Sequence, residues 1–385
     1  MANNNDNKVL NVPHLRFPEF TEEWEEHALA EYLDFKNGLN PDVKRIGRGL
    51  PFISVMDILA DGTINYDSIR GKVEATEREI ENFSVEKGDI LFQRSLETLE
   101  DVGRANVYMD NRTAVYGGFV IRGRKIGDYN PLFFKYLLST PLARKRTCRM
   151  GAGAQHFNIG QDGLSKISLC FPLMEEQNKI ARLLSLIDER IVTQNKIIDK
   201  LQSLIKGLRV CCMQRNGSDN VYLSEIAQIY QPQTISSAEL TEDGFLVYGA
   251  NGIIGKYKDY NHKTEQICIT CRGNTCGMVN YTKPMSWITG NAMVINTDKY
   301  QDKVYKKYLY HYLSAYNFNS IISGSGQPQI VRTPLEKLKI TLPTISEQKQ
   351  KAMILDKIQD KIEINHNVLN LYILQKQYLL RQMFI

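Results

Sequence analysis

The stretch PLMEEQNKIARLLSLIDERI at 172–191 decides the fold, because the chain contains a second version of it, PTISEQKQKAMILDKIQDKI, at 343–362. Both begin with proline, and both place Glu-Gln at the fifth and sixth positions. A preceding proline and carboxylates in the first turn are typical of helix starts, and Thr344 stands at capping-box spacing from Glu347. The sequence therefore predicts the same long helix twice, at an offset of 171 residues.

Similarity between the two halves continues upstream of both helices. KISLCFP at 166–172 lies over KLKITLP at 337–343 at the same offset. With a shift of two residues, the glycine-rich loop that starts at Gly151 lies over the loop that starts at Gly324. The chain is thus predicted to be a tandem, in which a mixed domain followed by a helix occurs twice.

Each predicted helix carries a heptad seam, in which apolar residues recur at spacings of four and three. In the first helix, eight of nine seam positions are apolar: Ile180, Leu184, Ile187, Ile191, Gln194, Ile198, Leu201, Ile205 and Leu208. In the second helix the middle of the seam consists of Leu355, Ile358, Ile362, Asn365 and Leu369. A heptad seam requires a partner helix, so we expect the two helices to pair with each other.

The fifth of the nine seam positions is polar in both helices, as Gln194 and Asn365. If the helices pair with their centres aligned, these two amides meet and can hydrogen-bond, which sets the register. The repeat does not say whether the pairing is parallel or antiparallel. The alternative is that each helix buries its stripe against its own mixed domain.

Short apolar runs bounded by Gly, Asp and Asn predict strands in both mixed domains. The runs lie at 52–55, 89–93, 114–121, 245–248, 266–270 and 292–295. One amphipathic helix is predicted after each set, at 130–147 and at 303–316. Each mixed domain is therefore expected to be α+β, and 385 residues exceed what one hydrophobic core usually supports.

The net charge of +5 is unevenly distributed. Residues 101–150 hold ten Lys and Arg against three Asp and Glu, and residues 256–307 hold nine against four. A basic region in each half suits an anionic partner, although scattered solvated lysines give the same counts. Seven cysteines, an odd number, and the lack of an apolar run of ~18–20 residues lead us to expect a cytoplasmic protein.

The sequence lacks the motifs of common catalytic sites. It contains no GxxxxGK[ST], GxSxG or HExxH, and Asn130-Pro-Leu-Phe133 lacks the second proline of an adenine-methyltransferase NPP[YF] motif. Cys268, Cys271 and Cys276 have no second Cys or His pair at zinc-ligand spacing. We therefore expect a binding protein that has no catalytic residues and holds no metal or cofactor of its own.

Glycine-rich loops before the last predicted strand of each half contain candidates for nucleic-acid contacts. Glycines let a loop approach a surface closely, and Gln or Asn amides can read adenine in a major groove. Arginines just after strands can contact bases or phosphates. The candidates are Arg94, Arg104, Gln155, His156, Asn158, Arg272, Asn274, Gln327 and Gln329. Ordinary turns are the alternative, but the basic regions in both halves favour DNA reading.

In their order and duplication, these motifs resemble the specificity subunit of type I restriction–modification systems. The resemblance covers essentially the whole chain. It rests on LRFPEF at 15–20 leading to Trp24, Asp57-Ile with Asp61-Gly62, GDIL at 88–91, the Gly/Gln loops and the two Pro-x-x-x-Glu-Gln helices. The second half departs from the pattern, because no clear Gly-Asp-Ile-Leu precedes the strand that leads to Arg272.

The resemblance implies two tandem α+β target-recognition domains, at 1–171 and 214–342, each followed by a spacer helix, at 172–213 and 343–385. The helices would pair as an antiparallel coiled coil with pseudo-twofold symmetry, and each domain would read half of a bipartite, asymmetric DNA site. The partners would be double-stranded DNA, two methylation subunits that use S-adenosylmethionine, and restriction subunits that use ATP and Mg. A two-domain coiled-coil scaffold that binds proteins instead of DNA is the alternative.

Overall fold

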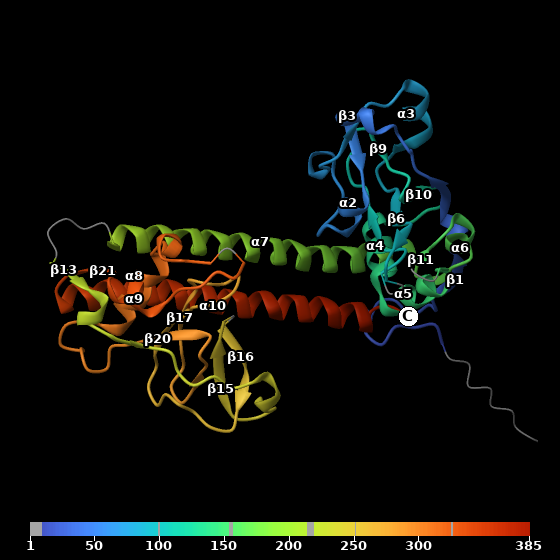
Figure 1. Cartoon of the computed structure of the whole chain (residues 1–385). Helices are drawn as coiled ribbons and strands as arrows, with labels where there is room; N and C mark the ends of the chain where they lie inside the picture. The colour runs from blue at the N-terminus through green and yellow to red at the C-terminus, as the bar shows by residue number, and fades with distance from the viewer. Residues whose placement is uncertain (1–9, 99–100, 154–156, 214–218, 251, 325) are drawn as a thin grey trace, which may run out of the picture. The chain divides into compact units, whose positions relative to one another are not determined.

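The structure is a computed structural model that describes residues 10–98, 101–153, 157–213, 219–250, 252–324 and 326–385. The chain divides into two compact units (Figure 1). Unit 1 lies within Met1–Gln194 and Val368–Ile385, and unit 2 lies within Asn195–Asn367. The two long helices, α7 (Met174–Met213) and α10 (Ile345–Gln382), each contribute one part to each unit.

Unit 1 contains a four-stranded antiparallel sheet in the order β2-β10-β6-β8 and a second sheet in the order β4-β3-β9-β5, in which β3 and β9 run parallel. Helix α4 packs against β8. The strands of these sheets are β2 (Leu33–Asn37), β3 (Ile46–Ile53), β4 (Lys72–Val73), β5 (Ser84–Val85), β6 (Ile90–Gln93), β8 (Ala105–Val107), β9 (Ala114–Tyr116) and β10 (Val120–Lys125). The other strands, which form two-stranded pairs, are β1 (Glu25–Ala28), β12 (Ser168–Phe171), β7 (Ser95–Leu96) and β11 (Phe157–Asn158). The shorter helices are α1 (Leu29–Tyr32), α2 (Val55–Leu59), α3 (Glu77–Phe83), α4 (Pro131–Ser139), α5 (Pro141–Arg149) and α6 (Gln161–Ser165).

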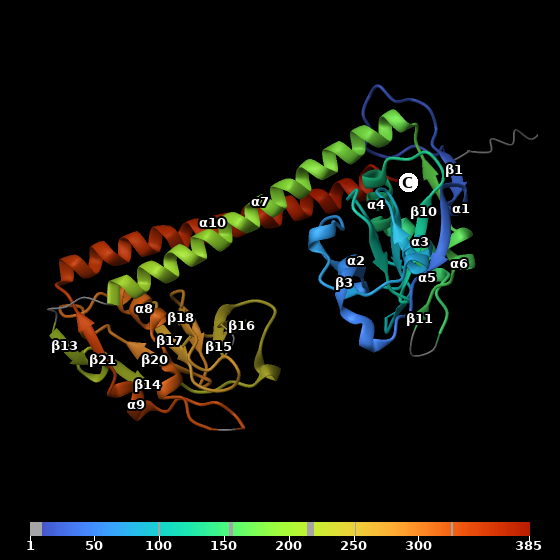
Figure 2. The same ribbon diagram turned by 90° about the horizontal axis from the view of Figure 1, so that it is seen from above.

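Unit 2 repeats this topology, with sheets in the orders β14-β20-β17-β18 and β16-β15-β19. Strands β15 and β19 run parallel, as β3 and β9 do in unit 1. Helix α8 packs against β18 (Figure 2). The elements are β13 (Asp219–Tyr222), β14 (Gln228–Tyr230), β15 (Phe245–Gly249), β16 (Gly252–Tyr257), β17 (Ile267–Thr270), β18 (Val279–Tyr281), β19 (Trp287–Ile288), β20 (Ala292–Asn296), α8 (Lys306–Ala315), α9 (Arg332–Glu336) and β21 (Lys339–Leu342). The shared strand order confirms the predicted tandem of α+β domains.

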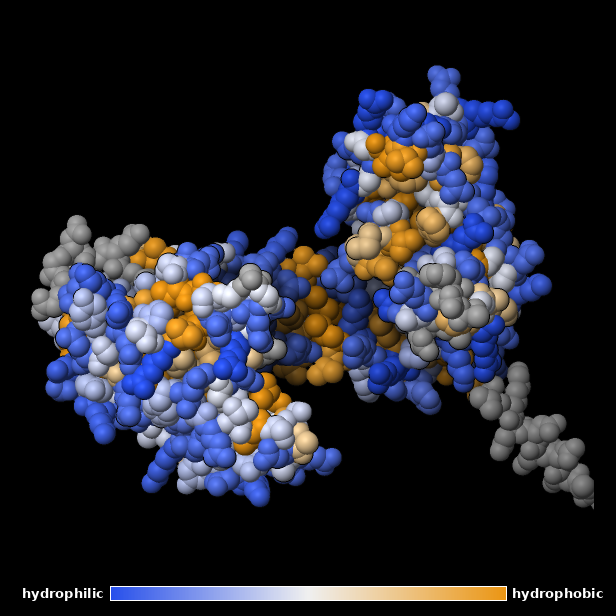
Figure 3. Space-filling model, viewed as in Figure 1, coloured by the Kyte–Doolittle hydropathy of each residue, from blue (hydrophilic) through white to orange (hydrophobic). Residues whose placement is uncertain are grey.

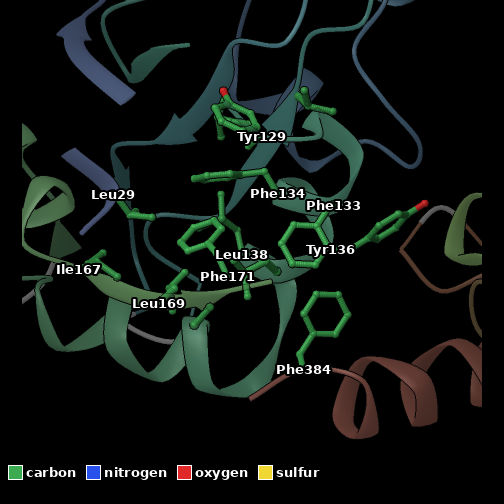
Figure 4. Close-up of a cluster of buried hydrophobic side chains, with 14 of the residues drawn as sticks. Leu29, Tyr129, Phe133, Phe134, Tyr136, Leu138, Ile167, Leu169, Phe171 and Phe384 are labelled. Carbon is green, nitrogen blue, oxygen red and sulfur yellow. The ribbon is translucent and has the colours of Figure 1, made fainter. Parts of the chain in front are cut away.

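The core of unit 1 is largely aromatic (Figure 4). Phe133 and Phe134 of α4 are fully buried, and the ring of Phe384, from the segment after α10, stacks on Phe133 at a centroid distance of 5.4 Å. Phe171 of β12 contacts both Phe133 and Phe134. Packing of this density ties the sheet, α4 and the C-terminal segment into one body.

The two long helices pair antiparallel. In unit 1, Leu184 at the start of α7 shares a buried cluster with Leu379 near the end of α10, and Lys376 Nζ lies 2.6 Å from Asp188 Oδ1. In unit 2, the last part of α7 packs against the first part of α10. The cluster there consists of the seam residues Leu201, Ile205, Leu208, Leu355, Ile358 and Ile362. Each helix thus pairs the start of its seam with the end of the other, as expected for an antiparallel coiled coil.

The start of α7 also packs against its own mixed domain, because Ile180 and Leu184 lie in the same cluster as Phe133 and Phe171. Both predicted uses of the apolar stripe therefore occur at this end of the helix. The meeting of Gln194 with Asn365 stays a prediction.

The glutamine of each repeated Glu-Gln pair binds its long helix to the mixed domain that precedes it. The Gln177 side chain accepts a hydrogen bond from the Asn130 N–H (3.0 Å) at the start of α4 and donates one to the Pro172 carbonyl (3.0 Å). Gln348 accepts from the Tyr305 N–H (2.8 Å) at the start of α8 and donates to the Pro343 carbonyl (2.9 Å). Each of the two glutamines thus links the start of its long helix to the start of α4 or of α8 through equivalent hydrogen bonds.

The preceding glutamates have different partners. Thr344 and Glu347 form the predicted capping box, in which each side chain bonds the backbone N–H of the other. Glu176 is almost fully buried and accepts hydrogen bonds from Arg16 Nε (2.8 Å), Arg16 Nη2 (2.7 Å) and Trp24 Nε1 (3.3 Å). The LRFPEF segment and Trp24 are therefore tied to the first long helix.

The structure corrects three details of the predicted elements. The helix expected at 130–147 is two helices, because Thr140 caps α5 and Pro141 cannot continue α4. The strand expected at 114–121 is broken into β9 and β10 by a turn at 117–119. The glycine-rich loops align at an offset of 171 without the two-residue shift, since the bridge between Ala152 and Asn158 matches the bridge between 323 and 329.

Candidate nucleic-acid interface

Three loops of unit 1 meet at the end of the sheet where β6 ends and β10 begins. The Arg94 N–H donates to the Phe119 carbonyl (2.9 Å), and the Arg94 carbonyl accepts from the Ile159 N–H (3.0 Å). Ala152 and Asn158 exchange two backbone hydrogen bonds and close the third loop. We call the described segments 94–96, 117–119, 152–153 and 157–158 the unit 1 loop cluster.

Unit 2 builds the same arrangement with equivalent hydrogen bonds. The Cys271 N–H donates to the Asn291 carbonyl (3.0 Å), and the Cys271 carbonyl accepts from the Ile330 N–H (3.0 Å). Ser323 and Gln329 exchange the two bonds that close the glycine-rich loop. The described segments 271–274, 289–291, 323–324 and 326–329 form the unit 2 loop cluster.

The unit 2 loop cluster contains all four candidates of the second half. Arg272 and Gln329 form a bridge between neighbouring extended segments, and Gln327 lies two residues before Gln329. Arg272, Asn274, Gln327 and Gln329 are all exposed. Among the described residues Arg272 has no ion-pair partner, so its charge is available to a phosphate.

The unit 1 loop cluster contains Arg94 and Asn158. Asn158 is exposed, whereas Arg94 is half-buried and points its Nη1 at the Gly118 carbonyl (3.5 Å). No acidic residue of the described chain pairs with Arg94. Gln155 and His156 lie outside the described residues.

Arg104 lies next to this cluster, because its carbonyl accepts from the Gln93 N–H (2.8 Å). Its guanidinium pairs with Asp101, which already offsets its charge. Arg104 also lines a cavity of about 420 Å³ together with Lys135, whose ammonium donates to the Gly62 carbonyl. Burial lowers the pKa of Lys135 to about 8.

The turn residues Phe119 and Asn291 were not among the sequence candidates, although the carbonyl of each accepts a hydrogen bond from the neighbouring loop of its cluster. Phe119 is 69% exposed, an unusual state for a large aromatic side chain, and Asn291 is exposed as well. Each follows a glycine at which an added Cβ would overlap a neighbouring side chain. A Cβ at Gly118 would lie 1.8 Å from Asn40 Oδ1, and one at Gly290 would lie 2.4 Å from Thr234 Oγ1. For Phe119 the sequence carried a signal, because Gly118 lies inside an apparent strand. Gly290 lies outside the strand predicted at 292–295 and gave no such signal.

The cysteines of β17 and the loop after it are positioned as structural thiols. Burial raises the pKa of Cys268 to about 12 and also raises the pKa of Cys271, which keeps both thiols protonated. The Gln231 amide donates to the Gly290 carbonyl (2.9 Å) and lies 3.2 Å from Cys271 Sγ.

Within the described residues, no group of three or more His, Cys, Asp or Glu side chains is arranged to hold a metal ion. No helix of the described chain is long and apolar enough to cross a bilayer.

A family model described as the type I restriction modification DNA specificity domain matches residues 21–203 and again residues 216–371. The chain belongs to this family. The duplicated match corresponds to the duplicated sheets and loop clusters of the two units.

Similar proteins agree with this assignment. The MjaVIII type I restriction enzyme specificity subunit of Methanocaldococcus jannaschii is 26% identical over 406 residues, which cover 91% of this chain and 88% of that protein. The EcoprrI specificity subunit of Escherichia coli is 32% identical over 140 residues, 35% of this chain and 34% of that one. The crystal structure of the S subunit from M. genitalium superposes with a TM-score of 0.66 at 16% identity, covering 97% of this chain and 99% of that one, and shares its fold.

Proposed function

We propose that this chain reads a bipartite, asymmetric DNA site, with one half-site contacted by each loop cluster. One observation carries the proposal. The same three-loop arrangement occurs in both units, with matched backbone hydrogen bonds and different exposed side chains. Matched scaffolds give both clusters the same way of approaching a duplex. Different side chains give each cluster its own sequence preference.

The nine candidates contribute in different ways to this proposal. Arg94 and Arg272 contact phosphates or guanine, and the amides of Asn158, Asn274, Gln327 and Gln329 contact base edges. Gln155 and His156 belong to the same glycine-rich loop by sequence. Arg104 lies beside the unit 1 loop cluster, and it contacts a phosphate only when its guanidinium leaves Asp101.

The chemistry belongs to partner subunits in this proposal. Two methylation subunits bind S-adenosylmethionine and methylate adenine at the site, and restriction subunits use ATP and Mg to cleave DNA. This chain supplies the target sequence and the geometry. It works in the cytoplasm, where its partners and the DNA are present.

The paired helices serve as a ruler between the half-sites. The seam from 180 to 208 spans 28 residues, about 42 Å at 1.5 Å per residue. DNA rises about 3.4 Å per base pair, so this length corresponds to about one turn of duplex. Deleting one heptad from each helix, 192–198 and 363–369, shortens the seam by ~10 Å and should shorten the unread spacer by about three base pairs.

The decisive experiment is methylome sequencing of a host that carries this chain and its methylation partner. A bipartite motif is expected. Replacing residues 216–342 with the equivalent segment of another specificity subunit should change one half of that motif, and replacing residues 1–171 should change the other. A motif without a gap, or changes in both halves from one replacement, would refute the modular reading.

A further inference from the structure

The turn that enters β10 and the turn that enters β20 occupy equivalent positions in the two loop clusters. In each turn, three backbone hydrogen bonds are matched. The first is a bond to the neighbouring parallel strand, which the N–H of Gly117 (3.0 Å) or of Thr289 (2.9 Å) donates. The second closes the turn, and it is donated by the N–H of Val120 (2.9 Å) or of Ala292 (3.0 Å). The third bond joins the Phe119 or Asn291 carbonyl to the loop after β6 or β17. Phe119 and Asn291 are therefore structural counterparts.

Packing does not explain why Phe119 is exposed. Phe119 lines a largely apolar cavity of about 380 Å³ with Ile46, Phe52 and Met56, and both Ile46 and Met56 are themselves exposed. Figure 3 shows apolar surface gathered over the β3 and β9 region of unit 1. Arg94, which has no acidic partner among the described residues, lies against the same turn through its contact with Gly118. An apolar side chain beside an available cation suits a ligand that is both anionic and partly apolar. DNA is such a ligand, because its major groove displays thymine methyl groups between the phosphates.

The backbone around Asn291 is fixed by hydrogen bonds, whereas its side chain is exposed. The adjacent Gly290 carbonyl is fixed by Gln231, and the Asn291 backbone N–H lies 3.4 Å from Thr289 Oγ1. The described residues provide no hydrogen-bond partner for its amide side chain. An exposed amide on a turn fixed from both sides is suited to bidentate contact with adenine N6 and N7.

We propose that Phe119 and Asn291 are specificity-determining residues at equivalent positions of the two half-sites, where Phe119 contacts a thymine methyl group and Asn291 reads an adenine. The proposal deepens the proposed function and rests on it. It also explains how a pseudo-symmetric pair of scaffolds reads an asymmetric site. Another equivalent pair, Asn158 and Gln329, keeps an amide in both units, whereas Phe119 and Asn291 differ in chemistry.

The test uses the full complex of this chain with its methylation partner and begins with the wild-type motif from methylome sequencing. Domain replacement assigns each half-site to its unit. Duplexes are then prepared in which each thymine of the unit 1 half-site is replaced in turn by uracil, which lacks only the methyl group. One replacement should weaken wild-type binding about fourfold, the value expected for about 0.8 kcal/mol per buried methyl group.

The Phe119→Ala variant should be insensitive to that same replacement while it remains sensitive to base changes elsewhere. Ile126→Ala is the matched control, because Ile126 is 61% exposed at the other end of β10. This control should show the wild-type response to uracil. For Asn291, replacing the contacted adenine by 7-deazaadenine should weaken wild-type binding, and the Asn291→Ala variant should lose about 5- to 150-fold in preference at that base pair.

Several results would overturn the proposal while the proposed function stands. They are a bipartite motif whose unit 1 half-site contains no thymine, an equal response of Phe119→Ala and wild type to every uracil, and an unchanged motif for both variants. A wild-type complex that methylates no bipartite motif would instead overturn the proposed function. If Phe119→Ala fails to fold, Phe119→Leu keeps an apolar side chain and should retain a reduced response to uracil.

Discussion

The anchoring of α10 by Gln348 can be tested by removing a single amide. Gln348 is 1% exposed, and its side chain bonds the Tyr305 N–H (2.8 Å) and the carbonyls of Pro343 (2.9 Å) and Lys303 (3.1 Å). In a Gln348→Met variant the side-chain volume is nearly unchanged, but three backbone groups lose their partner. Each unsatisfied buried group costs about 1–3 kcal/mol, and partial access of water lowers the sum, so we expect a loss of about 3 kcal/mol.

The matched control is Gln350→Met, which makes the same chemical change two residues further along the same helix at an exposed position. This control should stay within about 0.5 kcal/mol of wild type. Urea denaturation of the full chain measures both changes. Amide hydrogen exchange localises the effect, because a loss of 3 kcal/mol at the start of α8 corresponds to about 100-fold faster exchange of the Tyr305 N–H.

Two outcomes would refute this reasoning. If Gln348→Met costs no more than Gln350→Met, the amide does not hold α10 to α8. If stability falls but the Tyr305 amide stays protected, the loss arises elsewhere in unit 2. Gln177→Met should behave in the same way in unit 1, with exposure of the Asn130 N–H as its local signature.

Three further predictions concern groups outside the loop clusters. Lys135 has a folded-state pKa of about 8 against 10.5 in the unfolded chain, so the unfolded chain binds more protons between these values and stability should rise with pH from 8 to 10.5. Lys135→Met should remove this slope and raise stability below pH 8 by up to about 3 kcal/mol, measured as melting temperature against pH. Arg16→Met leaves the buried Glu176 carboxylate without its cation and should cost about 3–5 kcal/mol, whereas adding Glu176→Gln should restore part of the loss in a double-mutant cycle. In the helix pair, Ile205→Ala should lower the free energy of unfolding by about 2–4 kcal/mol in the urea denaturation assay. Leu204→Ala changes the half-exposed neighbouring position and should lower it far less. Equal losses for the two variants would contradict the pairing.

The long helices and their pairing could be predicted because their signals are local and periodic. A seam such as Ile180 to Leu208 repeats often enough to identify both the helix and its need for a partner, and Thr344 with Glu347 marks the helix start through spacing alone. The offset between the copies was also readable. The family followed from the order and duplication of these motifs.

Other features depended on contacts between distant parts of the chain. The role of Gln177 and Gln348 was hidden, because the backbone N–H groups that they bind at the starts of α4 and α8 lie 47 and 43 residues away. The turn at 117–119 was predicted as continuous strand, since a run of small and apolar residues satisfies a strand pattern whether or not the backbone leaves the sheet. Glycine-rich loops contain too little periodic signal to set an alignment, which explains the two-residue error.

The repeated helix start, the seam and the two-domain plan are thus properties of the sequence itself, because helix periodicity and capping act within a few residues. The candidate DNA-reading surface is a property of the tertiary structure. Arg94, Phe119 and Asn158 lie far apart in the chain, and only the order of strands in the sheet, through backbone hydrogen bonds such as those of Arg94 with Phe119 and Ile159, brings them to one edge. The strand order at that edge determines which side chains face a ligand. A local sequence pattern does not encode the strand order.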